Sequence, residues 1–268
     1  MKNIYRKLYI FSFSGGCVLA VLSVVYYFIW HDQFVVNGAL LVELGIAAIA
    51  AIGSGFYFRH AFHKLKTADE TSTDVFHFEE VTELTLKRVP ALIPKIVHVD
   101  SFGQPQFMIV PNRNWARPFM VLKLFEKGLI FPVSYTICDM NGSPIATFRI
   151  KNTVKQVTLS LWSSEGLLIG TYIQQLAKSV LVNRGTLYGS NGSIWRQLEA
   201  KNMTGDIDVT DEQGRMTATY RYGRFPYATH PAFVSTAHHD YVRFGSHISS
   251  DEKLAYTMIF FFWLSLED

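Results

Sequence analysis

Hydrophobic positions follow three patterns along the chain, and the first is a pair of long, almost uncharged apolar runs. Residues 11–30 carry no charge, and residues 34–58 carry a single charged residue, Glu43. A helix rises about 1.5 Å per residue, so each run reaches at least about 30 Å, the thickness of the hydrocarbon layer of a bilayer. The pattern therefore predicts an antiparallel transmembrane helical hairpin within residues 1–66. These lengths disfavour the alternative of two buried core helices.

Basic residues precede the first apolar run and follow the second, and none lies in the turn between the two runs. They are Lys2, Arg6, Lys7, Arg59, Lys64 and Lys66. Because cytoplasmic segments next to membrane spans are enriched in Lys and Arg, both ends of the hairpin are expected in the cytoplasm. The sequence thus predicts an integral membrane protein, placed in the plasma membrane, with both termini and the following domain on the cytoplasmic side.

Small residues recur at four-residue spacing on one face of each predicted span. They are Ser12, Gly16 and Ala20 in the first span and Ala47, Ala51 and Gly55 in the second. Such spacing lets helices approach closely in lipid. These faces are expected to pack within the hairpin, against a protein partner, or against a second copy of the chain.

Glu43 is an acid within the second predicted span. An ionisable residue inside a membrane is by default a candidate functional residue. Two interpretations stay open for it: a role in transport or partner binding, or a structural position near the outer turn.

The second pattern follows an acidic linker at residues 67–83 and alternates apolar and polar residues with a period of two. Two such runs flank residues 139–142 (DMNG), and Asn-Gly between β-type runs is a strong hairpin signal, because Asn and Gly both accept positive φ. Similar turns recur at residues 164–166, 190–192 and 211–214, a spacing of roughly two dozen residues. Short strands at such regular spacing predict a meander that closes as a barrel or a sandwich.

The third pattern is the apolar run from Leu254 to Leu266, which has acids on both sides. As a helix this run reaches about 20 Å, too short for a bilayer core of about 30 Å. Ser249 and Glu252 have the spacing of a capping box, which predicts a helix over about residues 250–266. A helix that is apolar on every side belongs in a core, so about ten to twelve strands around this helix form a consistent fold.

The repeated hairpins, an acid-rich turn and the terminal helix together resemble the tubby C-terminal-like superfamily, which includes tubby domains, LURP-one-related proteins and phospholipid scramblases. The resemblance rests on residues 135–142 (YTICDMNG) and 251–266, and it covers residues 84–268. It implies a mainly β fold: a closed antiparallel barrel of about twelve strands around a C-terminal hydrophobic helix. The N-terminal hairpin departs from the usual layout, because scramblases of this family carry one apolar segment at the C-terminus. The basic residues with which tubby domains bind phosphoinositides have no match here, so none is carried over.

Charge is unevenly distributed and supplies the main functional candidates. The formal net charge of +3 selects no partner by itself, but Lys and Arg outnumber the acids between Arg113 and Lys201. A basic surface beside an inner leaflet attracts anionic lipid at about 1 kcal/mol per residue. The candidate lipid-binding residues are Arg149, Lys151, Lys155, Arg184, Arg196 and Lys201. The alternative is an ordinarily solvated surface; nucleic acid is not an expected partner, because the sequence has no basic stripe with interleaved aromatics.

No constellation of side chains in the sequence indicates catalysis or a metal site. The densest group is residues 238–240 (HHD), with His230 and His247 nearby, but adjacent strand residues point in opposite directions. Cys17 and Cys138 are too few for a metal-ligand set or a disulfide framework. We therefore expect no enzymatic activity, no metal site and no cofactor.

Two functions are consistent with these patterns. The first is a membrane-anchored, non-enzymatic tubby-like domain in the cytoplasm that binds anionic phospholipid or a protein partner. The alternative is a membrane-active protein, such as a lipid scramblase or a transporter accessory subunit, that uses Glu43.

Overall fold

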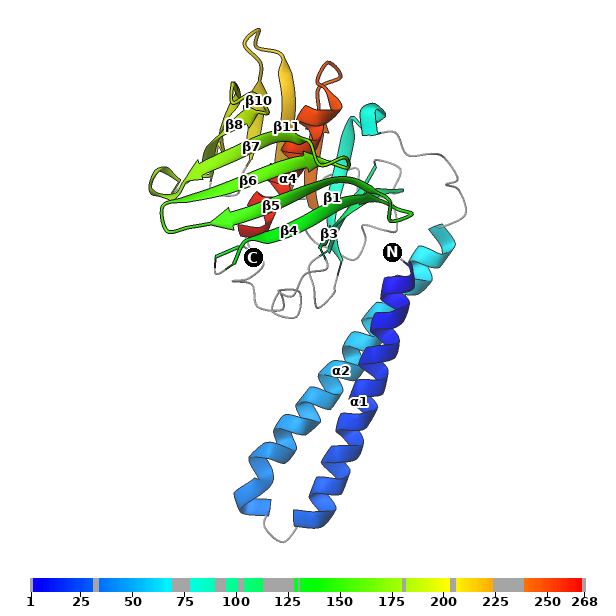
Figure 1. Cartoon of the computed structure of the whole chain (residues 1–268). Coiled ribbons are helices and arrows are strands. Elements are labelled where there is room, and N and C mark those ends of the chain that lie inside the picture. Colours follow the sequence, from blue (N-terminus) through cyan, green and yellow to red (C-terminus); the bar gives the residue numbers. More distant parts are fainter. Residues whose placement is uncertain are drawn as a thin grey trace. The chain divides into compact units, whose positions relative to one another are not determined.

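The computed structural model describes residues 2–30, 34–68, 78–89, 95–100, 104–112, 128–129, 131–179, 182–202, 206–223 and 239–266. The chain divides into two compact units, Met1–Ser72 and Thr73–Asp268 (Figure 1). The first unit is helical, and the second contains all the described strands.

Two long helices, α1 (Lys2–Trp30) and α2 (Phe34–Ala68), lie side by side in the first unit (Figure 1). Within them, Tyr5–Ile29 and Gly38–His60 are long and apolar enough to span a membrane. Many large apolar side chains of both segments are exposed, such as Phe28 and Ile49. A continuous exposed apolar surface of this kind is suited to contact with lipid tails.

Gly16 and Gly55 make the close approach between the two helices. A Cβ atom on Gly16 would lie 2.7 Å from Ile52 Cγ1, and a Cβ atom on Gly55 would lie 3.2 Å from the ring of Phe13. The ring of Phe13 in turn lies edge-on to Phe56, with centroids 5.0 Å apart. These two small residues therefore serve packing within the hairpin.

Among the residues that the structure describes in the second unit, twelve strands and two short 3-10 helices precede an α-helix. The strands are β1 (Glu83–Val89), β2 (Lys95–Val99), β3 (Pro105–Pro111), β4 (Val133–Asp139), β5 (Pro144–Asn152), β6 (Gln156–Ser163), β7 (Leu168–Gln175), β8 (Arg184–Gly189), β9 (Ile194–Glu199), β10 (Ile207–Thr210), β11 (Met216–Gly223) and β12 (His239–Phe244). The helices are η2 (Phe78–Glu80), η4 (Leu176–Lys178) and α4 (Ser250–Leu266).

The strands form one antiparallel sheet that almost closes on itself. Its order is β10-β11-β12-β1-β2-β3-β4-β5-β6-β7-β8-β9. The last strand, β12, pairs with the first strand, β1, and Thr85 lies opposite Tyr241 in this ladder. The two edges are β9 and β10, and no ladder joins them in the described residues. The predicted mainly β fold of twelve antiparallel strands is confirmed, with one open seam in the barrel.

Four hairpin turns of this sheet share one hydrogen-bonding pattern. At the turn between β4 and β5, Gly142 N donates to Asp139 O at 3.1 Å, and Asp139 N donates to Ser143 O at 3.0 Å. The equivalent turn glycines with positive φ are Gly142, Gly166, Gly192 and Gly214. No non-glycine residue in the described part of the chain has positive φ, so Asn141 does not share this conformation as the sequence interpretation assumed. The turn is closed by a single left-handed glycine, which needs no second residue at positive φ.

Helix α4 occupies the middle of the barrel (Figure 1). Every residue from Lys253 to Leu264 is at most 8 % exposed. Phe261 lies edge-on to Tyr135 of β4 and Phe148 of β5, with ring centroids 4.7 and 5.3 Å away. The prediction that the last apolar run is a core helix is confirmed, because strands surround it on every side.

Contacts at the start of α4 fix its position in the barrel. Glu252 N donates to Ser249 Oγ at 3.2 Å, as the capping-box pattern predicts. Lys253 is buried, and its Nζ donates to Glu79 O at 2.5 Å and to Val81 O at 2.8 Å. Burial lowers the pKa of Lys253, while the two carbonyl oxygens supply partners for the ammonium group. These bonds attach the first turn of α4 to the segment that precedes β1.

Some sequence predictions fall on positions outside the described residues. These are residues 69–77 of the acidic linker, and His230 and His238 of the His-rich group. At the two ends of the predicted linker, α2 continues to Ala68 and η2 begins at Phe78.

Candidate functional site

Arg149, Lys151 and Lys155 form an exposed group on β5 and the turn that follows it, here called the β5 basic cluster. Phe148 and Ile150 are fully buried, and successive side chains of a strand point to opposite faces. Arg149 and Lys151 therefore point out of the barrel. None of the three forms an ion pair with another residue that the structure describes.

The outward positions beside the cluster carry hydroxyl groups. Arg149 lies between Ser134 of β4 and Ser160 of β6 in the sheet register. Lys151 lies opposite Thr158 of β6. This part of the outer face therefore combines fixed positive charge with neutral hydrogen-bond donors, and both bind phosphate oxygens.

Acids are scarce in the sequence around the β5 basic cluster. Residues 140–198 contain a single acid, Glu165, which lies beyond the opposite end of β6 from Lys155. The 8 residues of β6 separate these two side chains by about 25 Å, at about 3.3 Å per residue. That distance is about three Debye lengths at physiological ionic strength, so Glu165 does not neutralise the cluster.

Two other predicted lipid-binding residues are engaged elsewhere in the fold. Arg196 Nη2 lies 3.0 Å from Glu252 Oε1 at the start of α4. Lys201 Nζ lies 2.5 Å from Asp208 Oδ2 on β10. The structure gives both bases an intramolecular partner and does not bring them together with the β5 basic cluster.

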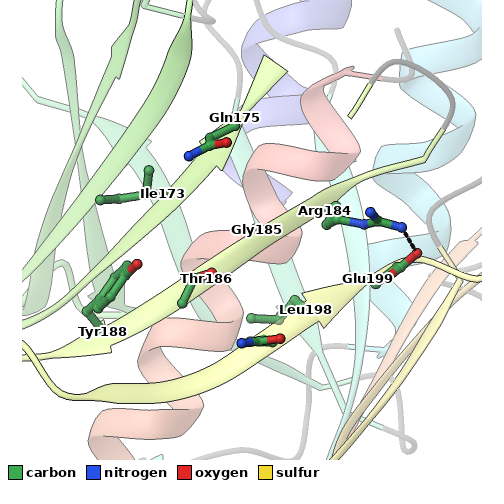
Figure 2. Close-up of a pocket in the computed structure, with 9 residues that line it drawn as sticks. Ile173, Gln175, Arg184, Gly185, Thr186, Tyr188, Leu198 and Glu199 are labelled. Atoms are coloured by element: carbon green, nitrogen blue, oxygen red, sulfur yellow. Dashed lines mark hydrogen bonds and ion pairs between the residues drawn. The ribbon is translucent and has the colours of Figure 1, made fainter. Parts of the chain in front are cut away.

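Arg184, the remaining predicted base, lines a hollow of about 520 Å³ on β7, β8 and β9 (Figure 2). It forms an ion pair with Glu199, directly opposite on β9. Gln175, Ile173 and Tyr188 line other parts of the same hollow. One base and one acid leave this lining formally neutral, so its amide and hydroxyl groups suit a polar, uncharged group.

Thr158 connects this hollow to the β5 basic cluster. Its strand position is paired with Lys151 on one side and with Ile173 on the other. Strands lie about 4.8 Å apart, so the backbones at Lys151 and Ile173 are about 10 Å apart. The two surfaces are neighbours on the outer face of one sheet.

Sequence reasoning missed the hollow and the exposed residue Val154. Ile173 and Tyr188 occupy ordinary outward strand positions, and no local signal marks them as lining a hollow. Val154 did have a signal, because it is an apolar residue in a turn between Lys151 and Lys155. It is 96 % exposed.

Glu43, the predicted intramembrane acid, is exposed on α2 inside the segment Gly38–His60. It forms no ion pair with another residue in the described part of the chain. Among the described residues of the hairpin, no Lys, Arg or His is placed to pair with this carboxyl group.

Among the described residues, no group of three or more His, Cys, Asp or Glu side chains is arranged to hold a metal ion. Comparison of the sequence with protein-family models and with curated proteins gives no match.

Proposed function

We propose that the protein is a membrane-anchored, non-enzymatic module whose barrel binds anionic phospholipid. In this proposal the α1–α2 hairpin anchors the chain in the plasma membrane, with both termini and the barrel on the cytoplasmic side. A tubby-like relationship is part of the proposal and is supported by twelve antiparallel strands around a C-terminal helix. The observation that carries the proposal is the β5 basic cluster: three exposed cations on a hydroxyl-lined face, within residues 140–198, which contain a single acid.

The expected strength of this binding suits an anchored domain. Each Lys or Arg near an anionic surface contributes about 1 kcal/mol, so the three cations give about 3 kcal/mol, or roughly a hundredfold. That is weak for a protein free in solution. A membrane anchor makes the contact intramolecular, at an effective concentration of about a millimolar or more, so even weak contacts are populated.

Amine labelling of the full chain in lipid nanodiscs tests this proposal. Lys151 and Lys155 are expected to react several-fold more slowly with an amine-reactive reagent in nanodiscs that contain phosphatidylglycerol than in pure phosphatidylcholine. The difference should vanish at high salt, because salt shortens the Debye length. Labelling at each lysine is measured by mass spectrometry.

Lys201 provides an internal control in the same experiment. It is an exposed lysine of the same barrel, but it is paired with Asp208. Its labelling rate should be the same in both lipids. Equal rates in the two lipids at Lys151 and Lys155 as well would contradict binding of anionic phospholipid by the β5 basic cluster.

A further inference from the structure

Val154 is the most exposed large hydrophobic residue among those that the structure describes, at 96 %. It lies at the tip of the turn between β5 and β6. Turn tips usually carry Gly, Asn, Asp, Ser or Pro, which suit turn backbones and interact well with water. The branched apolar side chain at this tip therefore packs against almost nothing among the residues that the structure describes.

The turn that presents Val154 is held by hydrogen bonds on both sides. Thr153 N donates to Gln156 O at 2.9 Å, and Gln156 N donates back to Thr153 Oγ1 at 3.2 Å. Leu176 N donates to Lys155 O at 3.0 Å, which attaches the turn to the start of η4. These hydrogen bonds fix the backbone of the turn, and the side chain of Val154 projects into solvent.

Cations stand directly behind this apolar tip. Lys151 and Lys155 flank Val154 in the sequence, and both are exposed. Along a strand, Lys151 lies about 10 Å and Arg149 about 17 Å behind the tip, at about 3.3 Å per residue. The polar headgroup layer on each side of a bilayer is about 5–8 Å thick. An apolar tip followed by flexible lysines matches the order of layers that a protein meets on entering a membrane surface.

We propose that the β5–β6 turn is a membrane-insertion loop, in which Val154 enters the lipid interface while Lys151 and Lys155 bind lipid phosphates. This inference rests on the proposed function and names the physical form of the ligand, a lipid surface. A soluble phosphate would use the cations but would leave Val154 in water. A bilayer uses both, because its apolar layer begins just beneath its phosphates.

A fluorescent probe at position 154 of the full chain tests the insertion. In a background with Cys17→Ala and Cys138→Ala, Val154→Cys is labelled with an environment-sensitive fluorophore and reconstituted in nanodiscs. In nanodiscs with phosphatidylglycerol, the emission should shift to the blue, and nitroxide groups on the lipid chains should quench it. Both effects should be lost in pure phosphatidylcholine and with Lys151→Glu/Lys155→Glu.

Leu167→Cys is the matched control. Leu167 is an exposed apolar residue in the turn at the opposite end of β6, next to Glu165 and Gly166. A probe there should stay in water in both lipids. Insertion at both positions would indicate general adsorption of the barrel and would overturn the proposal.

A second variant measures the contribution of the valine itself. Val154→Ser should weaken the binding of the turn to anionic lipid by about tenfold, because one Val side chain no longer leaves water. Most of the several-fold slowing of labelling at Lys151 and Lys155 should then be lost, whereas Val154→Leu should retain it.

The outcomes separate this inference from the proposed function. If Lys151 and Lys155 are protected by anionic lipid while the probe at position 154 stays in water, the insertion is refuted and the lipid-binding function stands. If neither effect occurs, both are refuted.

Discussion

His98 is a buried imidazole without a hydrogen-bond partner among the described residues. It is 1 % exposed, and neither of its ring nitrogens is paired. The ring stacks on Phe107, opposite it on β3, with centroids 4.1 Å apart and a tilt of 16°. Burial lowers the pKa of His98 from 6.5 to about 3, because the charged form would lose its hydration without gaining a partner. The barrel therefore holds this histidine in its neutral form.

The pH dependence of barrel stability follows from this depressed pKa. Below about pH 6.5 the unfolded chain takes up a proton at His98 that the folded barrel excludes until about pH 3. The free energy of unfolding should therefore fall with decreasing pH in this window, at up to about 1.4 kcal/mol per pH unit from this residue. We expect His98→Leu to remove that contribution and to leave stability at pH 7 no lower. Denaturant unfolding of the full chain in detergent micelles at pH 7 and pH 5 measures the difference.

His247 is the control for this titration. It is part of a surface contact, with Nε2 3.4 Å from Asp211 Oδ2. His247→Gln should leave the His98 contribution intact. An unchanged pH dependence in His98→Leu would show that the buried imidazole is not the group responsible.

At the scale of the element, helix α4 supplies the apolar side chains that fill the interior of the barrel and pack against its strands. Tyr256, Phe260 and Trp263 form a chain of ring contacts along the helix, with centroids 5.9 and 6.0 Å apart. Tyr220 of β11 stacks on Phe260 at 5.1 Å. Burial of such rings contributes about 1.5–3 kcal/mol each, and the net stability of a domain is only about 5–15 kcal/mol. The barrel therefore depends on this one helix.

Truncation of Phe261 tests that dependence. Phe261→Ala should lower the free energy of unfolding by about 3–5 kcal/mol, because it removes ring contacts with Tyr135 and Phe148 and leaves a cavity. Phe261→Leu should cost less, since it keeps most of the volume. Leu167→Ala, at an exposed position, should change stability by less than about 0.5 kcal/mol. Near-UV circular dichroism during denaturant unfolding of the full chain reports these values; equal effects at positions 261 and 167 would argue against a core role for α4.

At the scale of the whole second unit, a polar network spans the seam that the strands leave open. Arg196 of β9 pairs with Glu252 of α4 at 3.0 Å, and Tyr256 OH donates to the same carboxylate at 2.9 Å. Tyr256 OH also lies 2.9 Å from Thr217 Oγ1 of β11, where either hydroxyl can donate to the other, and Thr217 Oγ1 lies 3.1 Å from Val209 O of β10. Burial raises the pKa of Tyr256, and the nearby Glu252 carboxylate adds to this effect. Through these side chains α4 connects the two edges of the sheet.

A double-mutant cycle measures the contribution of this connection. Arg196→Met and Glu252→Met should be coupled by about 1–3 kcal/mol, because either single change leaves a poorly hydrated charge without its partner. Side chains of this pair are 22 % and 14 % exposed, against 48 % and 56 % for the Arg184–Glu199 pair. The same cycle at Arg184 and Glu199 should give about 0–1 kcal/mol. Amide hydrogen exchange should accelerate in β9 and β10 of the Arg196 and Glu252 single mutants, and acceleration confined to β4–β6 would contradict this account of the seam.

The candidate site was only partly predictable from the sequence. Some of its basic residues form ion pairs with residues that are distant in the sequence, and others do not. Arg149, Lys151 and Lys155 are neighbours in sequence, and strand alternation alone directs Arg149 and Lys151 outward. Arg196 and Lys201 looked equivalent to them in the sequence, yet their partners come from α4 and β10. An ion-pair partner that only the fold brings close cannot be recognised from the residues next to the base in the sequence.

The sequence by itself determined the local structure of this protein: two apolar helices, hairpins marked by turn glycines, and a terminal helix too apolar for any place but a core. These features depend on residues within a few positions of each other, through helix length, strand alternation and turn geometry. Only the tertiary structure decided that β12 pairs with β1, that the seam falls between β9 and β10, and that Arg196 and Lys201 form ion pairs. Those features depend on contacts between residues far apart in the chain, such as Lys253 with Glu79 and Val81. Their energies come from packing and desolvation that exist only after the strands have closed around α4.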